Sequence, residues 1–133
     1  MTMISHVNNL DKKCFSCSLE IVKALNNVKE AERKKKAKEL FNFITKSLGI
    51  LQEDGVFAFY VYLKSEKDEK SNTINAIEEE TVNLLKESIN DQLNASLEKI
   101  QLLAEDINTL LLAKSLIEKT LIYARYQVKS ESD

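Results

Sequence analysis

The sequence predicts an all-α fold, a single-domain helical bundle of about five to six helices. The chain has no proline and only two glycines among its 133 residues, whereas all-β domains need many turn-forming residues. Leu, Lys, Glu, Ala and Ile dominate the composition, and most of these residue types favour helix. With 44% hydrophobic residues, a chain of this length can bury one core without disulfides or metals. We expect one domain over residues 1–133, with flexible ends at 1–8 and 130–133.

The first half of the chain predicts two amphipathic helices. Apolar residues three and four positions apart indicate a first helix from about Asn9 to Asn27. The same spacing indicates a second helix over Glu30–Leu48. Its expected buried face comprises Ala37, Leu40, Phe41, Ile44 and Leu48. Gly49 follows directly, where a helix C-cap glycine is expected.

The run Val56–Leu63 is the ambiguous segment, because it holds eight apolar or aromatic residues in succession. β-Propensity alone would favour a buried strand. A lone strand needs a partner, and the sequence offers no second strand. We therefore predict a buried central helix that is capped near Asp54. The polar segment Ser65–Thr73 is expected to be an exposed loop.

The second half predicts further helices. One begins near Thr73 or Ile74, places Glu78–Glu80 on its exposed start and ends near Asn90. Helical spacing then continues from Leu93 to Val128, which is too long for one globular helix. A break near Glu105–Asp106, a suitable cap, leaves a last helix over Ile107–Val128.

The sequence nominates no catalytic or metal site, so we expect neither enzymatic activity nor a cofactor. Cys14 and Cys17 have CxxC spacing, but a zinc site needs four ligands and His6 is the only histidine. Buried free cysteines on the first helix are the simpler interpretation. A catalytic histidine needs an orienting partner, which nothing near His6 supplies. The two glycines are isolated, so no phosphate-binding glycine loop exists.

Basic residues gather on the second predicted helix, although the net charge is only −2. Lys34, Lys35, Lys38 and Lys46 fall on or near one exposed edge, and Arg125 and Lys129 of the last helix would widen it. Such an edge suits contact with several phosphates of a nucleic-acid backbone. A solvated face that serves only solubility is the alternative, and it is the commoner meaning of a charge run.

The sequence also bears on location. The first ten residues lack the apolar run of a secretory signal, and no stretch approaches 18 uninterrupted apolar residues. Two cysteines suggest no disulfide framework. We therefore expect a cytoplasmic protein without a membrane partner.

Two stretches resemble the small all-helical subunit of the type III-B (Cmr) CRISPR RNA-guided effector complex. The first contains Lys36-Ala37-Lys38-Glu39-Leu40, the turn Leu48-Gly49-Ile50, the apolar Val56-Phe57-Ala58-Phe59 and Leu63-Lys64-Ser65. The second contains Leu110-Leu111-Leu112-Ala113-Lys114 and Leu121-Ile122-Tyr123-Ala124-Arg125-Tyr126. They are similar to that family's basic helix, glycine turn and apolar helix, and to its last amphipathic helix.

The resemblance implies a non-catalytic subunit that acts in antiviral defence. Its copies would line the inner filament of the complex, with neighbouring copies, other effector subunits, guide RNA and target RNA as partners. Its basic face would hold the guide–target duplex through phosphates without reading bases. Two alternatives stay open. One is the small subunit of a type I-A CRISPR complex. The other is a helical protein-interaction adaptor that binds no nucleic acid and docks its partners through the acidic region 78–106 and the apolar segment 56–63.

Overall fold

The chain folds into a single all-α domain, as predicted. The computed structural model describes residues 2–67 and 72–132, and their side chains from Asn9 onward. These residues form six α-helices and two 3₁₀ segments and contain no strand. The elements are α1 (Thr2–Val22), η1 (Lys23–Asn27), α2 (Glu30–Asp54), α3 (Val56–Glu66), α4 (Asn72–Ser88), α5 (Leu97–Ile100), η2 (Gln101–Glu105) and α6 (Ile107–Ser132).

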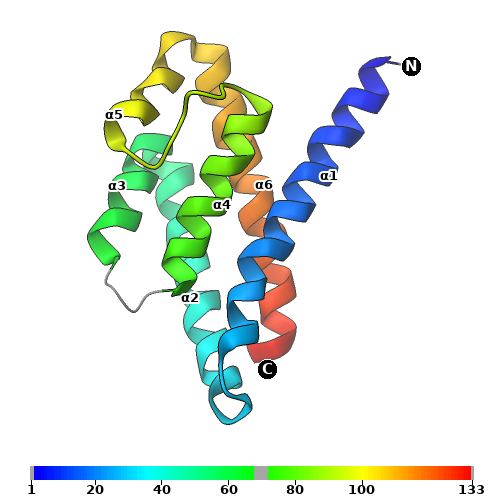
Figure 1. Cartoon of the computed structure of the whole chain (residues 1–133), viewed down its shortest axis with the longest axis vertical. Coiled ribbons are helices and arrows are strands. Elements are labelled where there is room, and N and C mark those ends of the chain that lie inside the picture. The colour runs from blue at the N-terminus through cyan, green and yellow to red at the C-terminus, as the bar shows by residue number, and fades with distance from the viewer. Residues whose placement is uncertain (1, 68–71, 133) are drawn as a thin grey trace.

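The two longest helices, α2 and α6, run antiparallel and form the spine of the bundle (Figure 1). An ion pair between Arg33 and Glu131 joins them near one end, and Gln52 contacts Glu118 near the other. The helix α1 packs against both α6 and α4, and α3 lies on the far side next to α2. The first turns of α1 diverge from the rest of the bundle (Figure 1).

The segment Val56–Leu63 is the helix α3, which confirms the choice of helix over strand. Its buried residues are Val56, Phe59, Tyr60 and Leu63. The expectation that the whole run is buried is wrong, because Phe57 is 38% and Val61 is 52% exposed. These two side chains are four residues apart and therefore share one exposed side of α3.

The predicted end of the second helix is wrong by six residues. The helix α2 passes through Gly49 and ends at Asp54, because Leu51 extends its buried stripe by another turn. The helix breaks at Gly55, whose φ of 96° lies in a region that residues with a Cβ rarely adopt. Gly55 separates α2 from α3, and its amide donates to the carbonyl of Leu51 at 3.0 Å.

Other helix boundaries also differ from those that the apolar spacing predicted. The helix α1 begins at Thr2, not near Asn9, and α6 continues to Ser132, beyond the predicted end at Val128. Leu93 is buried in a loop, and α5 begins only after Ser96, whose hydroxyl accepts from the amide of Glu98. The predicted break before the last helix is confirmed.

That break has the expected cap. The carboxylate of Asp106 accepts a hydrogen bond from the amide of Asn108 at 2.9 Å, at the start of α6. The apolar side chains around the break divide between core and surface. Ile100 and Leu103 are buried, whereas Leu97, Ile107 and Leu111 are 41%, 66% and 55% exposed.

The placement of Glu78 on an exposed helix start is wrong. Its side chain is only 5% exposed and pairs with two lysines, Lys64 of α3 at 3.2 Å and Lys67 at 2.8 Å. The neighbouring Glu79 is exposed, as expected. Because consecutive residues on a helix point in different directions, a run of three carboxylates can place one of them inward.

Candidate nucleic-acid interface

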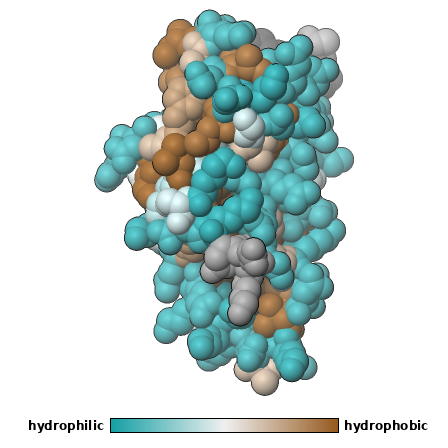
Figure 2. All heavy atoms as spheres, turned by 60° about the vertical axis from the view of Figure 1, so that its left-hand side comes forward, coloured by the Kyte–Doolittle hydropathy of each residue, from teal (hydrophilic) through white to brown (hydrophobic). Residues whose placement is uncertain are grey.

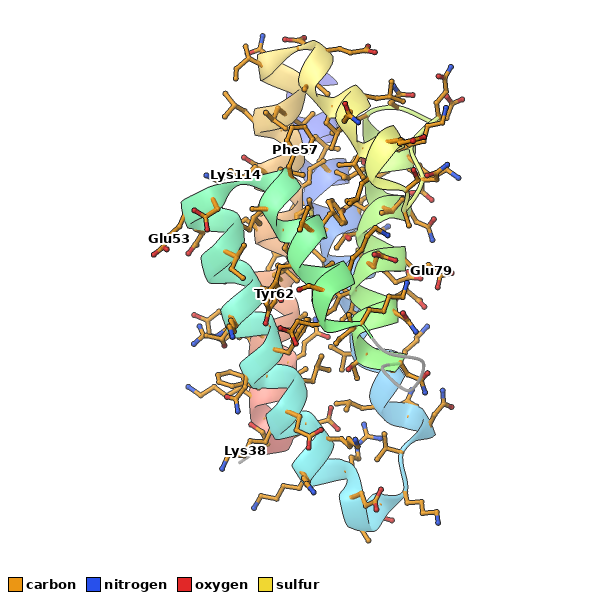
Figure 3. All side chains as sticks on the ribbon, turned by 90° about the vertical axis from the view of Figure 1, so that its left-hand side faces the viewer. Lys38, Glu53, Phe57, Tyr62, Glu79 and Lys114 are labelled. Carbon is orange, nitrogen blue, oxygen red and sulfur yellow. The ribbon has the colours of Figure 1, made fainter. Side chains whose placement is uncertain are left out.

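The four lysines predicted on the second helix all lie on the solvent side of α2. Lys34, Lys35, Lys38 and Lys46 are exposed, whereas the core face of α2 points into the bundle. Among the described residues, none of these four ammonium groups takes part in an ion pair. Lys38 projects from α2 near the end opposite to Glu53 (Figure 3).

The lysines do not form one straight edge. A helix turns by 100° per residue, so each step of four residues shifts the direction by about 40°. Lys46, three such steps after Lys34, therefore points about 120° away from it around α2. The predicted edge divides into two sides, one along α6 and one along α3.

The side along α6 is identified by Phe41 and Thr45, which both contact Arg125 of α6. Lys34 and Lys38 precede these residues at helical spacing and so share their side of α2. On α6, Lys129 follows Arg125 by one turn and is exposed. We call Lys34, Lys38, Arg125 and Lys129 the basic seam, since they line the outer junction of two antiparallel helices.

Arg125 is the most constrained cation of this seam. Its Nε donates to the hydroxyl of Thr45 at 2.9 Å, and its guanidinium carbon lies 5.0 Å from the centre of the Phe41 ring. The sequence predicted Phe41 as a core residue, but it is only partly buried and supports Arg125. Thr45 was not singled out from the sequence. Its position seven residues after Lys38, on the same side of α2, was the available signal.

Lys46 lies on the α3 side of α2. Its Nζ is 5.6 Å from the centre of the Tyr62 ring, and Tyr62 stacks on Phe43 with the ring centres 5.6 Å apart. Tyr62 reaches from α3 toward α2 (Figure 3). Lys35 precedes Lys46 by eleven residues and points the same way. These two lysines extend the positive surface around α2 but do not face the seam.

Two acidic groups next to the seam are engaged by other cations. Glu131 accepts from Arg33, with Nε at 2.7 Å and Nη2 at 2.6 Å. Glu39 pairs with Lys36 at 3.4 Å. Because these carboxylates are occupied, they leave the charges of Lys34 and Lys38 available to an external anion.

Away from the seam, titratable side chains also gather at a cleft. A cleft of about 370 Å³ between α1 and α4 is lined by Lys12, Lys13, Glu20, Glu80 and Cys17, among others. Burial, with Glu80 and Cys14 nearby, raises the pKa of the Cys17 thiol to about 12, which makes it a poor nucleophile at neutral pH. Burial, Glu20 and Glu79 raise the pKa of the Glu80 carboxyl.

Cys14 and Cys17 are buried and unbonded to each other, as interpreted from the sequence. Their thiols point to different helices, to the carbonyls of Leu116 in α6 and Glu80 in α4. Within the described side chains, no three His, Cys, Asp or Glu residues are grouped to hold a metal ion. The side chain of His6 lies outside the described residues. None of the described helices is both long and apolar enough to cross a membrane.

Among the predicted site residues in the described part of the chain, those of the basic seam are therefore the ones that the fold brings together from two helices. Lys46 and Lys35 border it on the other side of α2. The chain matches no family model, no curated protein and no solved structure.

Proposed function

We propose that this chain is a non-catalytic RNA-binding subunit of an RNA-guided antiviral effector complex of type III-B. In this role the basic seam holds a guide–target RNA duplex by its phosphates, and other subunits perform cleavage. The observation that carries the proposal is the placement of Lys34, Lys38, Arg125 and Lys129 along one junction, where none of them forms an ion pair among the described residues. The resemblance of residues 36–65 and 110–126 to the small Cmr subunit supplies the identity of the complex.

Phosphate binding fits the chemistry of the seam. Lysine ammonium groups are mobile point charges that bind a backbone regardless of its sequence. Their affinity comes from the release of condensed counterions, so it must fall with increasing salt. Two packed helices, α2 and α6, carry these cations, so one backbone that follows their junction can meet several of them. Nothing in this arrangement reads base edges.

The test is the affinity of the protein for a fluorescein-labelled guide–target RNA duplex, measured by anisotropy over a range of salt concentrations. Replacement of the three seam lysines Lys34, Lys38 and Lys129 by Glu should abolish binding at physiological salt. Replacement by Gln should lower the steepness of the salt dependence by about one for each lost phosphate contact. Unchanged affinity in the triple variants would refute the seam as the binding surface.

A matched control separates position from net charge. Lys12, Lys86 and Lys99 are exposed on α1, α4 and α5, so their triple replacement by Glu changes the net charge by the same amount. We expect this control to bind RNA with an affinity close to that of the wild type. An equal loss in both triple variants would mean that general charge, and not the seam, governs binding.

Exposed apolar side chains favour a second function, protein docking. Phe57 and Val61 of α3, Leu97 of α5 and Ile107 and Leu111 of α6 are all exposed. Brown, apolar side chains gather in the upper half of the face in Figure 2, while most of its surface is hydrophilic. A subunit of a larger complex needs such contacts, and so does an adaptor that binds only proteins.

Two variants distinguish the functions. Phe57→Ser with Val61→Ser should release protein partners recovered from native lysate but leave RNA affinity intact. Treatment of the recovered assembly with ribonuclease should release partners that the RNA bridges. If all partners survive ribonuclease and the lysine variants bind them normally, the chain acts as a protein adaptor instead.

A further inference from the structure

Two arginines lie at the junction of α2 and α6, and their surroundings differ. Arg33 uses its whole guanidinium within the fold: Nε and Nη2 bind Glu131, and Nη1 donates to the carbonyl of Leu25 at 3.1 Å. Arg125 uses only Nε. Among the described residues, neither of its Nη nitrogens has a hydrogen-bond or ion-pair partner. Arg33 is thus a structural tie, whereas Arg125 keeps two donors available.

The donors of Arg125 are unpaired, but its guanidinium is held in place. The hydroxyl of Thr45 donates to the carbonyl of Phe41 at 2.9 Å, which turns an oxygen lone pair toward Nε of Arg125. The Phe41 ring supports the face of the guanidinium by a cation–π contact. Phe41 therefore acts twice, through its ring and through its carbonyl. One edge and one face of the guanidinium are fixed, and the edge that carries both Nη groups remains open.

We infer that Arg125 is a preorganised phosphate anchor within the basic seam, and that Phe41 and Thr45 are its positioning residues. The inference rests on the proposed function and adds a division of labour among the cations. An arginine fork can donate two parallel hydrogen bonds to one phosphate. A fork that is already immobilised loses less freedom on binding than a mobile lysine does. Arg125 should then set where the backbone lies, while Lys34, Lys38 and Lys129 supply attraction.

The sharpest test changes no charge. Thr45→Val removes the acceptor of the Arg125 Nε and keeps the size of the side chain. We expect the affinity for the labelled RNA duplex to fall about two- to tenfold, the effect of one lost hydrogen bond. The steepness of the salt dependence should not change, because every cation is retained. Thr45→Ser keeps the hydroxyl and should restore the wild-type affinity.

Variants of the arginine itself complete the test. Arg125→Lys keeps the charge but loses the fork, so it should weaken binding without altering the salt dependence. Arg125→Gln should also lower the steepness of the salt dependence by about one. Arg33→Lys is the structural control. It should lower the stability to urea but leave the RNA affinity of the folded protein unchanged.

The outcomes separate this inference from the proposed function. If the lysine variants lose RNA while Thr45→Val binds like the wild type, the seam binds RNA but Arg125 is not a held anchor. Equal losses in Thr45→Val and Thr45→Ser would also overturn the anchor, since the hydroxyl would not be the cause. If neither the lysine nor the arginine variants change binding, both the seam and the anchor are refuted.

Discussion

The carboxylate of Glu78 lies inside the bundle and accepts a hydrogen bond from Nζ of Lys67 at 2.8 Å, with Lys64 bound to its other oxygen at 3.2 Å. Glu78 is 5% exposed, whereas the two lysines are 38% and 32% exposed. A buried charge is tolerated only while it is paired. These contacts therefore tie Lys64, in the last turn of α3, and Lys67, directly after α3, to α4.

We expect removal of both lysines to destabilise the fold strongly. In Lys64→Met with Lys67→Met, the buried carboxylate of Glu78 loses both partners, and the free energy of unfolding should fall by about 3–5 kcal/mol. Either single replacement should cost less, because one partner remains. Urea unfolding followed by circular dichroism measures both effects.

Lys36→Met is the control for that experiment. Lys36 pairs with Glu39, but both side chains are about half exposed. A surface pair of this kind contributes about 0–1 kcal/mol, so the variant should unfold nearly like the wild type. A double variant at Lys64 and Lys67 that is as stable as this control would show that Glu78 needs no partner.

We expect replacement by alanine to have opposite effects on stability at the two glycines. Gly55 has a φ of 96°, and Gly55→Ala should destabilise the protein by about 1–3 kcal/mol through backbone strain. Gly49 lies inside α2, where Gly49→Ala should stabilise by about 0.5–1 kcal/mol. Neither change introduces a clash, because no atom lies within 4 Å of the added Cβ at either position.

Thermal denaturation of the two alanine variants checks this pair directly. The midpoint should fall for Gly55→Ala and rise for Gly49→Ala. The reverse order would place the helix break at Gly49, as the sequence first suggested. The comparison thus tests the boundary between α2 and α3 without assuming it.

Local sequence patterns predict features that depend on neighbouring residues, and they miss features that depend on contacts between distant ones. Fold class, the helix at Val56–Leu63 and the cap at Asp106 depend on composition and nearby residues, and all three were predicted. The end of α2 was missed because both glycines fit a cap signal. Only the added buried turn around Leu51 and the backbone at Gly55 decide between them.

In the candidate site, too, local features were predicted and contacts between helices were not. Exposure of the lysines followed from the helical repeat of α2. Contacts between helices did not, because Arg125 and Thr45 are 80 residues apart in sequence. The pairing of Glu78 with Lys64 and Lys67 was missed for the same reason. The helical repeat of α4 puts Glu78 on the buried face, four residues after Ile74 and three before Thr81, but it does not indicate which cations pair with it.

A buried hydrogen-bond chain joins α3 to α4 and predicts an asymmetric pair of variants. The hydroxyl of Tyr60 donates to Oγ1 of Thr81 at 2.9 Å, and Thr81 donates to the carbonyl of Ile77 at 2.7 Å. Thr81→Val leaves the Tyr60 hydroxyl buried without an acceptor and should cost about 1–3 kcal/mol. In the double variant with Tyr60→Phe, no such donor remains, and we expect part of that loss to be recovered. A double variant less stable than Thr81→Val would argue against this hydrogen bond.

Alkaline pH should destabilise the fold through its buried thiols and a buried tyrosine. Burial raises the pKa of the Cys17 thiol to about 12, and burial raises the pKa of the Tyr60 hydroxyl above its usual value. In the unfolded chain a thiol has a pKa of about 8.5 and a tyrosine hydroxyl a pKa of about 10. Above those values the unfolded state has lost protons that the folded state retains. Stability is therefore complete at neutral pH and falls as pH rises, by about 1.4 kcal/mol per pH unit for each group.

Single variants show which buried group causes each part of this loss of stability at alkaline pH. Urea unfolding between pH 7 and 11 should show a decline that begins near pH 9 and steepens above pH 10. Cys17→Ala should reduce the first part but not abolish it, because burial also raises the pKa of the Cys14 thiol. Tyr60→Phe should remove the second and leave the first. A decline of the same steepness in all three proteins would assign the alkaline loss to other groups.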